Sequence, residues 1–550
     1  MTPRPVYKHI PFILLILVLL IFGLSTFRDY GLSWDEPLFY EYGEALGYAY
    51  TPANWFRADF DLNNAYGSSG DDHKNRGPAY LVLARIPVHI LESLGADSPS
   101  AWHLVNFLTF LLGVYFIYRL SLRFMGEWAA FGAAALFSTQ PLLLGHAFIN
   151  PKDMPFLVFF TGALLFGFES VDRIFSKSKP RDFIFHLSSF ILPAFFLGIA
   201  TSIRVLAPLA GILVIIYAII KYYALRNTKY AMNARSFILH LSSFILLSIL
   251  FMLASWPYLW ESPVKNFFQV FLFMSENPTG LQVLFNGEIY RAFELPRHYL
   301  PTLLAITLSE PVWPLFIFGL GTAIWKTIIP LRNRLPTSDS RPPTPNHQLP
   351  TDYWLTLTAF LIPSLYVIAL RPPMYDGFRH FLFILPPIFV TAGLGFQSIL
   401  NGLERIRPQT TSRLYVGIIC IILVVNIVPA ANLHPFEYTY YNSLVGGTGG
   451  AFRIYETDYW LTCYKQAVEQ VNMLGPANLF VHREAYIATT YAANGLNVFE
   501  ERGNLKNIRS GDYILVNSRT NEDRKTFHDA PAVIEVGRDG AIFCVVKQVP

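Results

Sequence analysis

Eleven apolar runs recur along the chain, and most are long enough to cross the hydrocarbon core of a bilayer. An α-helix needs about 20 residues to span about 30 Å of hydrocarbon, and backbone inside lipid must be bonded within helices or closed barrels. Because 53% of the residues are hydrophobic and only 15% are charged, an ordinary soluble globular protein is excluded. The sequence therefore predicts an α-helical polytopic membrane protein of about eleven transmembrane helices, at residues 10–27, 101–122, 127–147, 154–170, 183–201, 205–223, 236–256, 305–328, 353–370, 379–398 and 413–431.

The distribution of Lys and Arg between the loops predicts the orientation of these helices. The run at 10–27 is followed by no small-residue cleavage site, so we interpret it as an uncleaved anchor with a cytoplasmic N-terminus in the cell membrane. Most cations then fall in cytoplasmic loops, and the small net charge of +4 is too dispersed for a nucleic-acid partner. A few cations fall in outer loops and need a reason: Lys152, Arg204, Arg371 and Arg379.

The composition changes towards that of a soluble protein near residue 432. Residues 1–431 are predicted to form the transmembrane domain, including a long outer loop at 28–100, and residues 432–550 a small extracytoplasmic α/β domain. Within this tail we expect strands at 478–481, 513–516, 533–536 and 541–546 and a helix at 462–474. Cys463 and Cys544 could pair there if the tail is exported, and the sequence leaves that pairing open.

Three further segments have distinct patterns. The apolar stretch 80–94 is interrupted by polar residues, so we expect an interfacial helix instead of a span. The stretch 331–351 is rich in Pro, Ser and Thr, which is typical of a flexible linker. The string from His434 to Trp460 is dense in glycine and aromatic residues, and it could be either a sugar-binding loop or a turn region that joins the two domains.

An acidic pair, Asp35 and Glu36, follows the first apolar run within the string Trp34-Asp35-Glu36. The pair is predicted to lie where the first helix meets the outer face of the membrane, within reach of lipid headgroups and water. A carboxylate in that place can act as a base on a lipid-linked substrate. The alternative is that both residues cap a helix or solvate a loop.

Charged side chains near bilayer depth are costly unless they face a cavity and find partners there. Each outer cation, taken alone, could be a snorkelling interface residue. Taken together, the charges of separate outer loops predict one pocket for a phosphate-bearing lipid. We assign substrate binding to Lys74, Arg76, Lys152, Asp153, Arg204, Arg379 and His380.

The acidic pair after an uncleaved first helix, the outer loop Asn150-Pro151-Lys152-Asp153 and an Arg at the outer start of a late helix resemble C-type (GT-C) glycosyltransferases. The sequence is most similar in these features to protein O-mannosyltransferases and lipid A aminoarabinose transferases. The resemblance covers residues 1–430. Two departures stand out: Arg76-Gly77-Pro78 replaces the His-Pro-Pro that such enzymes often have, and an acidic metal-binding triplet is missing. No metal ligand is therefore assigned, and a requirement for a divalent cation stays open.

The resemblance implies a polyprenyl-phosphate sugar donor and an inverting transfer to a lipid, glycan or protein acceptor. Asp35 is then the general base with Glu36 as its partner, because direct displacement needs one group to take the acceptor's proton. The cations would stabilise the phosphate as it gains negative charge. The alternative is a polytopic lipid or glycan transporter or flippase, which would place ionisable groups at the middle of the membrane.

Overall fold

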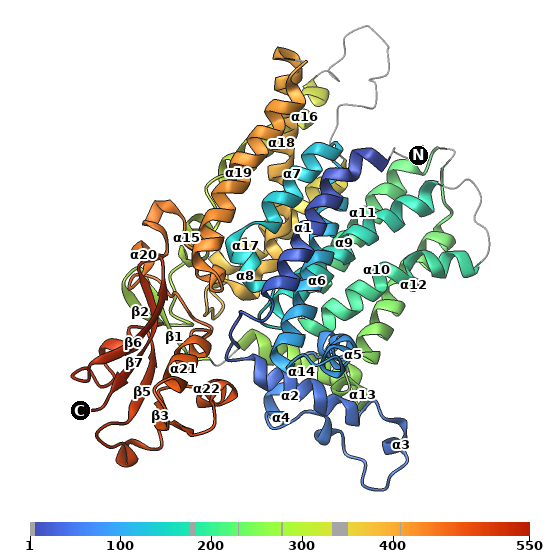
Figure 1. Cartoon of the computed structure of the whole chain (residues 1–550). Helices are drawn as coiled ribbons and strands as arrows, with labels where there is room; N and C mark the ends of the chain where they lie inside the picture. The colour runs from blue at the N-terminus through green and yellow to red at the C-terminus, as the bar shows by residue number, and fades with distance from the viewer. Residues whose placement is uncertain (1–5, 177–182, 229, 277–278, 333–349, 408) are drawn as a thin grey trace.

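The computed structural model describes residues 6–176, 183–228, 230–276, 279–332, 350–407 and 409–550. A bundle of helices forms most of the molecule, and a β-sheet lies beside the end of the bundle that carries α2 (Glu36–Ala45) (Figure 1). The N-terminus lies at the opposite end of the bundle (Figure 1). Most of the predicted linker 331–351 lies outside the described residues.

Seven described helices are long and apolar enough to cross a membrane, as expected for a multi-pass membrane protein. The two most buried of these helices begin at Asp153 and Arg379. In their most apolar stretches, 89% and 83% of the residues are buried inside the protein. In α12 and α19 only 28% and 22% of the corresponding residues are buried, so these two helices lie at the periphery of the bundle. The long helices are α6 (Ser98–Ser121), α9 (Asp153–Ser176), α11 (Pro208–Leu225), α12 (Ala234–Ala254), α17 (Thr351–Leu370), α18 (Leu385–Ile406) and α19 (Thr411–Leu433).

The other four predicted spans are helical but shorter or broken, so fewer helices pass the length criterion than the eleven predicted. One is α1, which has 17 residues, and another is α10, whose described apolar part covers 188–203. A third is two helices bent by 108° at their junction, which together can make one span. The elements concerned are α1 (Ile10–Thr26), α10 (Phe183–Ile203), α7 (Glu127–Ser138) with α8 (Pro141–His146), and α15 (Tyr299–Thr307) with α16 (Val312–Arg332).

The break between α7 and α8 faces the break between α15 and α16. Pro141 begins α8, and a residue before proline is disfavoured in the helical region, so Gln140 adopts an extended conformation. The buried Gln140 side chain donates to the carbonyl of Thr307 at 3.1 Å and accepts from the Ser309 hydroxyl at 2.8 Å. The Ser309 amide also donates to Gln140 Oε1, at 3.2 Å. Gln140 thus satisfies two backbone groups at the break between α15 and α16, and these bonds position α8 and the loop that follows it.

Short elements cover the α2 end of the bundle. The predicted helix at 80–94 is confirmed as α5 (Ala79–Ser93), and its Ile86, Ile90 and Leu94 side chains are exposed. Such an exposed apolar face is what an interfacial helix presents. The remaining elements here are α3 (Pro52–Trp55), α4 (Gly70–His73), α13 (Tyr258–Glu261), α14 (Pro263–Glu276), β1 (Gln282–Phe285) and β2 (Glu288–Arg291).

The C-terminal part forms a five-stranded mixed sheet in the order β4-β3-β5-β7-β6. The four predicted strands and the predicted helix are present, and β4 is a strand that the sequence analysis missed. Cys463 and Cys544 form a disulfide with their Cα atoms 6.1 Å apart. The elements are α20 (Gly447–Ala451), α21 (Tyr464–Asn472), β3 (Ala477–Val481), α22 (Ala485–Tyr491), β4 (Leu496–Glu500), β5 (Tyr513–Asn517), β6 (Ala532–Arg538) and β7 (Ala541–Gln548).

Candidate active site

The loop that carries Asp35 is held against the C-terminal domain. A Cβ at Gly31 would lie 2.2 Å from the carbonyl oxygen of Thr462, so only glycine allows this close approach. The Trp34 amide donates to the carbonyl of Trp460 at 3.1 Å, and the Tyr486 hydroxyl donates to the carbonyl of Trp34 at 2.5 Å. The backbone on the N-terminal side of Asp35 is therefore fixed by a domain more than 400 residues away in sequence.

The two acidic residues have different environments. Glu36 is fully buried, and its carboxylate accepts from the Ser33 amide, the Tyr40 hydroxyl and the Asn150 amide, with His103 Nε2 at 3.3 Å. Burial raises the pKa of Glu36, but His103 and these donors outweigh burial and hold the pKa below its ordinary value. The Asp35 side chain keeps 23% of its exposure. Glu36 is thus committed to structural contacts, and Asp35 is the carboxylate open to a substrate.

Asn150 connects the loop before α9 to both acidic residues. Its backbone has φ 62°, in the left-handed region that Asn adopts more readily than most residues. Its Oδ1 accepts from the amides of Lys152 and Asp153 at 2.9 and 3.1 Å. Its own amide donates to Glu36 at 3.2 Å, and its Nδ2 lies 3.4 Å from Asp35 Oδ2. The turn at 150–153 is thereby set in register with the start of α2.

Arg379 joins three carboxylates at this place. It opens the turn of 3₁₀-helix, Arg379–Ile384, that leads into α18. Its Nη1 lies 3.1 Å from Asp35 and 3.2 Å from Asp153, and its Nη2 lies 3.0 Å from Asp376. The guanidinium also lies 4.2 Å from the centre of the Trp460 ring, in a cation–π arrangement. With 3% exposure, this cation is compensated by protein charges and not by water.

Asp153 is the second connection between the long helices. It begins α9 and is fully buried, with one carboxylate oxygen facing Arg379 and the other paired with Arg204, which follows α10. Buried ion pairs persist when both charges are matched and bonded. Asp153 therefore acts through the two arginines, and its carboxylate is not free to bind a sugar hydroxyl.

Asp35 lines a cavity of about 230 Å³. One part of the cavity wall is charged or polar, and another part is apolar. The charged and polar part comes from four separate loops of the chain. The apolar part is contributed mainly by α14 and by the segments next to α10 and α17. The polar lining comprises Asp35, Asn75, Arg76, Asn150, Lys152, Arg204, Arg379 and His380, and the apolar lining includes Phe39, Ile203, Val205, Leu206, Trp256, Val270, Phe271, Phe273, Met274, Tyr366, Pro372 and Pro373.

Lys152 is the cation of this cavity whose charge is least compensated. Its Nζ lies 5.0 Å from the centre of the Phe39 ring, and the carboxylates near it, Asp72 and Asp153, are paired with arginines. Within the described part of the chain no carboxylate lies at ion-pair distance from Lys152. Burial, together with Arg76 and Arg204, lowers the pKa of Lys152 well below its ordinary value. An anion in the cavity would reverse this destabilisation.

Most of the residues predicted for the site meet there. Arg76 lines the cavity while paired with Asp72, and His380 lines it half-buried beside Tyr375. Lys74 does not, because its Nζ pairs at the surface with Asp71 at 2.8 Å. No role is predicted from the sequence for Asn150 or Asp376, because loop residues of this kind carry no pattern that marks a site. Among the described residues no group of three or more His, Cys, Asp or Glu side chains forms a metal-binding set.

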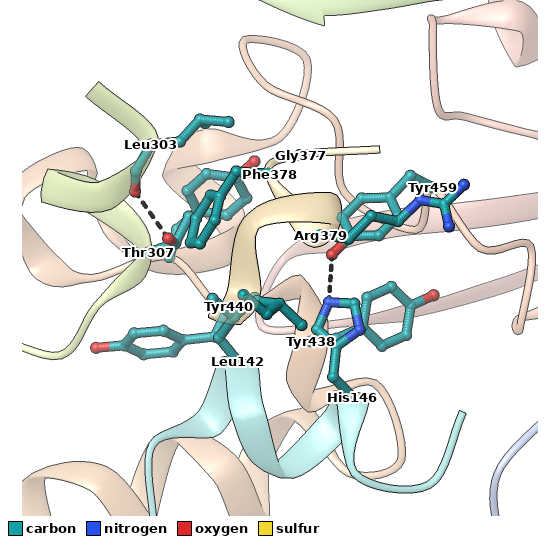
Figure 2. A pocket seen from close by; sticks show the side chains of 12 residues that line it. Leu142, His146, Leu303, Thr307, Gly377, Phe378, Arg379, Tyr438, Tyr440 and Tyr459 are labelled. Atoms are coloured by element: carbon teal, nitrogen blue, oxygen red, sulfur yellow. Dashed lines mark hydrogen bonds between the residues drawn. The ribbon is translucent and has the colours of Figure 1, made fainter. Parts of the chain in front are cut away.

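A second cavity of only about 20 Å³ lies near Arg379, between α8 and the string 434–460 (Figure 2). Figure 2 shows the Tyr459 hydroxyl directed at the His146 ring, 2.9 Å from its Nε2. The space is about that of one water molecule, and each of the four tyrosine hydroxyls has a protein partner already. This geometry favours the joining role of the string over sugar binding. The tyrosines are Tyr438, Tyr440, Tyr441 and Tyr459.

The fold and the site define a multi-pass membrane protein with a carboxylate and several cations around one cavity. No protein-family model matches the chain, and no curated protein matches it. Solved structures similar to it include ArnT from Cupriavidus metallidurans in the apo state, with 12% identity over 97% of each chain and a TM-score of 0.49. The Archaeoglobus fulgidus oligosaccharyltransferase in the apo form is 11% identical, covering 91% of this chain and 69% of that chain, with a TM-score of 0.48. The arabinofuranosyltransferase AftD from Mycobacteria is 13% identical, covering 97% of this chain and 40% of that chain, with a TM-score of 0.41.

Proposed function

We propose that the chain is a membrane glycosyltransferase that moves a sugar from a polyprenyl-phosphate donor to an acceptor, with Asp35 as the general base. One observation carries the proposal. A partly exposed carboxylate, a poorly compensated buried cation and an apolar lining share one cavity. Such a cavity matches a substrate that has a sugar, a phosphate and a hydrocarbon chain. The resemblance of the acidic pair and of the turn at 150–153 to C-type glycosyltransferases supports the same reaction.

The phosphate of the donor is assigned to Lys152 and its neighbours. Charge-assisted hydrogen bonds from a cation to phosphate are about twice as strong as neutral ones. Lys152 is the natural partner because Arg204 and Arg76 already have carboxylates. A bound phosphate keeps Lys152 protonated, so its affinity includes the relief of a buried and poorly compensated charge.

The isoprenoid chain of the donor is assigned to the apolar part of the cavity. Val270 and Met274 of α14 line it, one turn apart on the same face of the helix. Phe271 lines the cavity as well and is 46% exposed, so the lining continues to the outer surface of the bundle. The chain of a membrane-bound donor is already surrounded by hydrocarbon, so moving it onto this lining gains little free energy from burial. The apolar lining instead lets the chain stay out of water while the phosphate reaches Lys152.

The reaction is a direct displacement at the anomeric carbon. Asp35 takes the proton of the acceptor hydroxyl as its oxygen forms a bond to the anomeric carbon, and the bond from that carbon to the phosphate oxygen breaks. The leaving polyprenyl phosphate gains one negative charge, which Lys152 and the nearby arginines stabilise. The single displacement inverts the anomeric configuration. Glu36, which is buried, and Asn150, whose Nδ2 lies 3.4 Å from Asp35 Oδ2, set the position of Asp35.

The orientation is part of the proposal. The C-terminal segment 432–550 and the loop 28–100 lie at the end of the bundle opposite to the N-terminus (Figure 1). The cavity is lined by residues of this loop, among them Asp35 and Arg76. With a cytoplasmic N-terminus, as the Lys and Arg distribution favours, the cavity opens on the extracytoplasmic side of the cell membrane. The donor then enters from the outer leaflet. The acceptor remains one of the three classes, lipid, glycan or protein.

The test is a transfer assay with membranes that contain the chain and a panel of radiolabelled polyprenyl-phosphate sugars, followed by counting of lipid, glycan and protein fractions. We expect one donor to label one fraction, and Asp35→Asn to lower the rate about 10²- to 10⁴-fold. Asp59→Asn is the matched control, because Asp59 is a 70% exposed loop carboxylate paired with Arg57. No labelled product from any donor, or an unchanged rate for Asp35→Asn, would contradict the proposal.

A further inference from the structure

We propose that Arg519, in the C-terminal domain, is a positioning residue for Arg379 and acts through Asp376. The C-terminal domain then completes the active site in addition to docking on the bundle. This inference rests on the proposed function only in so far as Arg379 holds the base Asp35. The relay of charges itself can be tested without any transfer assay.

Asp376 lies between two arginines from different parts of the chain. Its Oδ1 is 2.6 Å from Arg519 Nη2, and its Oδ2 is 3.0 Å from Arg379 Nη2. Asp376 is fully buried and both arginine side chains are 3% exposed, so water does not screen the contacts. Each oxygen of one carboxylate therefore has its own cation, and the position of one guanidinium depends on the other.

Arg519 is itself held rigidly. It follows β5, its amide donates to Asn517 Oδ1 at 2.6 Å, and its Nε donates to Glu456 Oε1 at 2.9 Å. Its guanidinium also lies 5.7 Å from the centre of the Trp34 ring, next to the base. A side chain fixed from three sides can transmit a position, whereas a flexible surface arginine cannot.

The balance of charges explains why Arg519 affects the base. Arg379 divides its donors between Asp376 on one side and Asp35 with Asp153 on the other. Without Arg519 the whole charge of Asp376 falls on Arg379 and draws it away from Asp35. Contacts such as the Tyr486 hydroxyl on the Trp34 carbonyl dock the same domain without contacting Arg379. Docking and positioning can therefore be separated.

The first experiment compares Arg519→Met and Arg519→Lys with Arg453→Met in the full chain. Arg453 is a matched control, because it is also a largely buried arginine that pairs with a carboxylate, Asp523 at 2.6 Å, away from Asp376. For Arg519→Met we expect kcat to fall about 10- to 100-fold, with KM changed less than twofold, because the base is misplaced while the binding residues are unchanged. Arg519→Lys should recover most of kcat. A kcat and KM for Arg519→Met that match those of the Arg453→Met control would overturn the inference.

A second measurement works even if the chain transfers no sugar, which would reject the proposed function alone. The Tm is measured for four purified proteins: the native chain, Arg519→Met, Asp376→Asn and the double variant. If Asp376 is the partner of Arg519, the loss of Tm caused by Arg519→Met should be at least halved in the Asp376→Asn background. Equal losses in both backgrounds would show that no relay exists.

Discussion

Arg379 Nη1 lies 3.1 Å from Asp35 Oδ2, although the two residues are 344 positions apart in the chain. The same nitrogen lies 3.2 Å from Asp153, the first residue of α9. One guanidinium thus connects the loop that carries Asp35 with the two most buried long helices. Because the contact is charge-assisted and fixed at both ends, it sets the direction in which the Asp35 carboxylate points.

The first prediction concerns the replacement of this cation. Arg379→Gln removes the ion-pair partner of Asp35 and leaves Asp153 and Asp376 with one arginine each. We therefore expect the free energy of unfolding to fall by about 3–5 kcal/mol and transfer to fall more than 100-fold. Arg379→Lys keeps the charge but cannot donate to several carboxylates at once, and we expect an intermediate loss of activity. Denaturant titration and the transfer assay measure the two effects. Arg371→Gln is the control, since Arg371 is exposed, and equal behaviour of both Gln variants would contradict the prediction.

The second prediction concerns the donor phosphate. Lys152→Met removes the cation assigned to it, and because a charged hydrogen bond is worth about 1.5–3 kcal/mol, the KM for the donor should rise about 10- to 100-fold. Stability should hold or increase, since a buried and poorly compensated charge disappears. Lys74→Met is the matched control because Lys74 pairs with Asp71 outside the cavity. A rise in KM for Lys74→Met, or none for Lys152→Met, would reassign the phosphate site.

The pH dependence of donor binding follows from the same side chain. The lowered pKa of Lys152 means that the free site loses its charge as the pH rises through that value. Donor affinity is therefore greatest below it and declines above it. Lys152→Arg, which stays charged at all relevant pH values, should flatten this decline. A decline of equal size in the Arg variant would show that another group is responsible.

Much of the site could be predicted because charged residues next to the ends of apolar runs are easily recognised in the sequence. Asp35, Lys152 and Arg379 each interrupt a pattern that membrane insertion otherwise enforces. The hydrophobic runs likewise located the helices. The breaks at Gln140 and between α15 and α16 were not visible in hydropathy, because long-range hydrogen bonds satisfy the freed backbone groups.

The partners of these charges could not be predicted, because their roles arise from contacts between distant segments. Asp376 stands in a loop sequence typical of a turn, and its two arginines come from positions 379 and 519. The sequence predicts Asp35 as the base and Glu36 as its catalytic partner, but the structure buries the Glu36 carboxylate in contacts with Ser33, Tyr40 and Asn150. The sequence of α14 is that of an ordinary aromatic-rich loop. Only the fold shows that its apolar side chains line the same cavity as Lys152.

The fourth prediction concerns Asn150, which has a left-handed backbone conformation and a side chain that accepts two hydrogen bonds. Asn150→Gly keeps the left-handed backbone at no steric cost but loses the side-chain bonds, whereas Asn150→Ala loses both. We expect Asn150→Gly to lower the free energy of unfolding by about 1–3 kcal/mol and Asn150→Ala to lower it by about 1 kcal/mol more. Both variants should transfer sugar more slowly. Asn286→Ala controls for strain alone, since Asn286 has φ 55° and is exposed. If Asn150→Ala lost no more stability than Asn286→Ala, the connecting role of Asn150 would be wrong.

The last prediction concerns Glu456, the buried carboxyl group that accepts from Arg519. Burial, together with the nearby Asp376, raises the pKa of Glu456 to about 7 despite Arg519. In the unfolded chain it ionises near its ordinary value of 4.5, so between these two values the folded state binds a proton that the unfolded state has lost. The stability from this group is complete below the unfolded value and is lost as the pH rises through about 7.

The change from pH 5 to pH 8 should therefore lower the melting temperature of the native chain more than that of Glu456→Gln, whose side chain does not titrate. Glu469→Gln serves as the control because Glu469 is exposed on α21, and it should melt like the native chain at both pH values. Melting curves of the purified protein in one detergent and at one ionic strength give the comparison directly. If Glu456→Gln kept the full pH dependence, the titrating group would lie elsewhere, and Arg519 would have to be held by a carboxylate that is charged throughout this range.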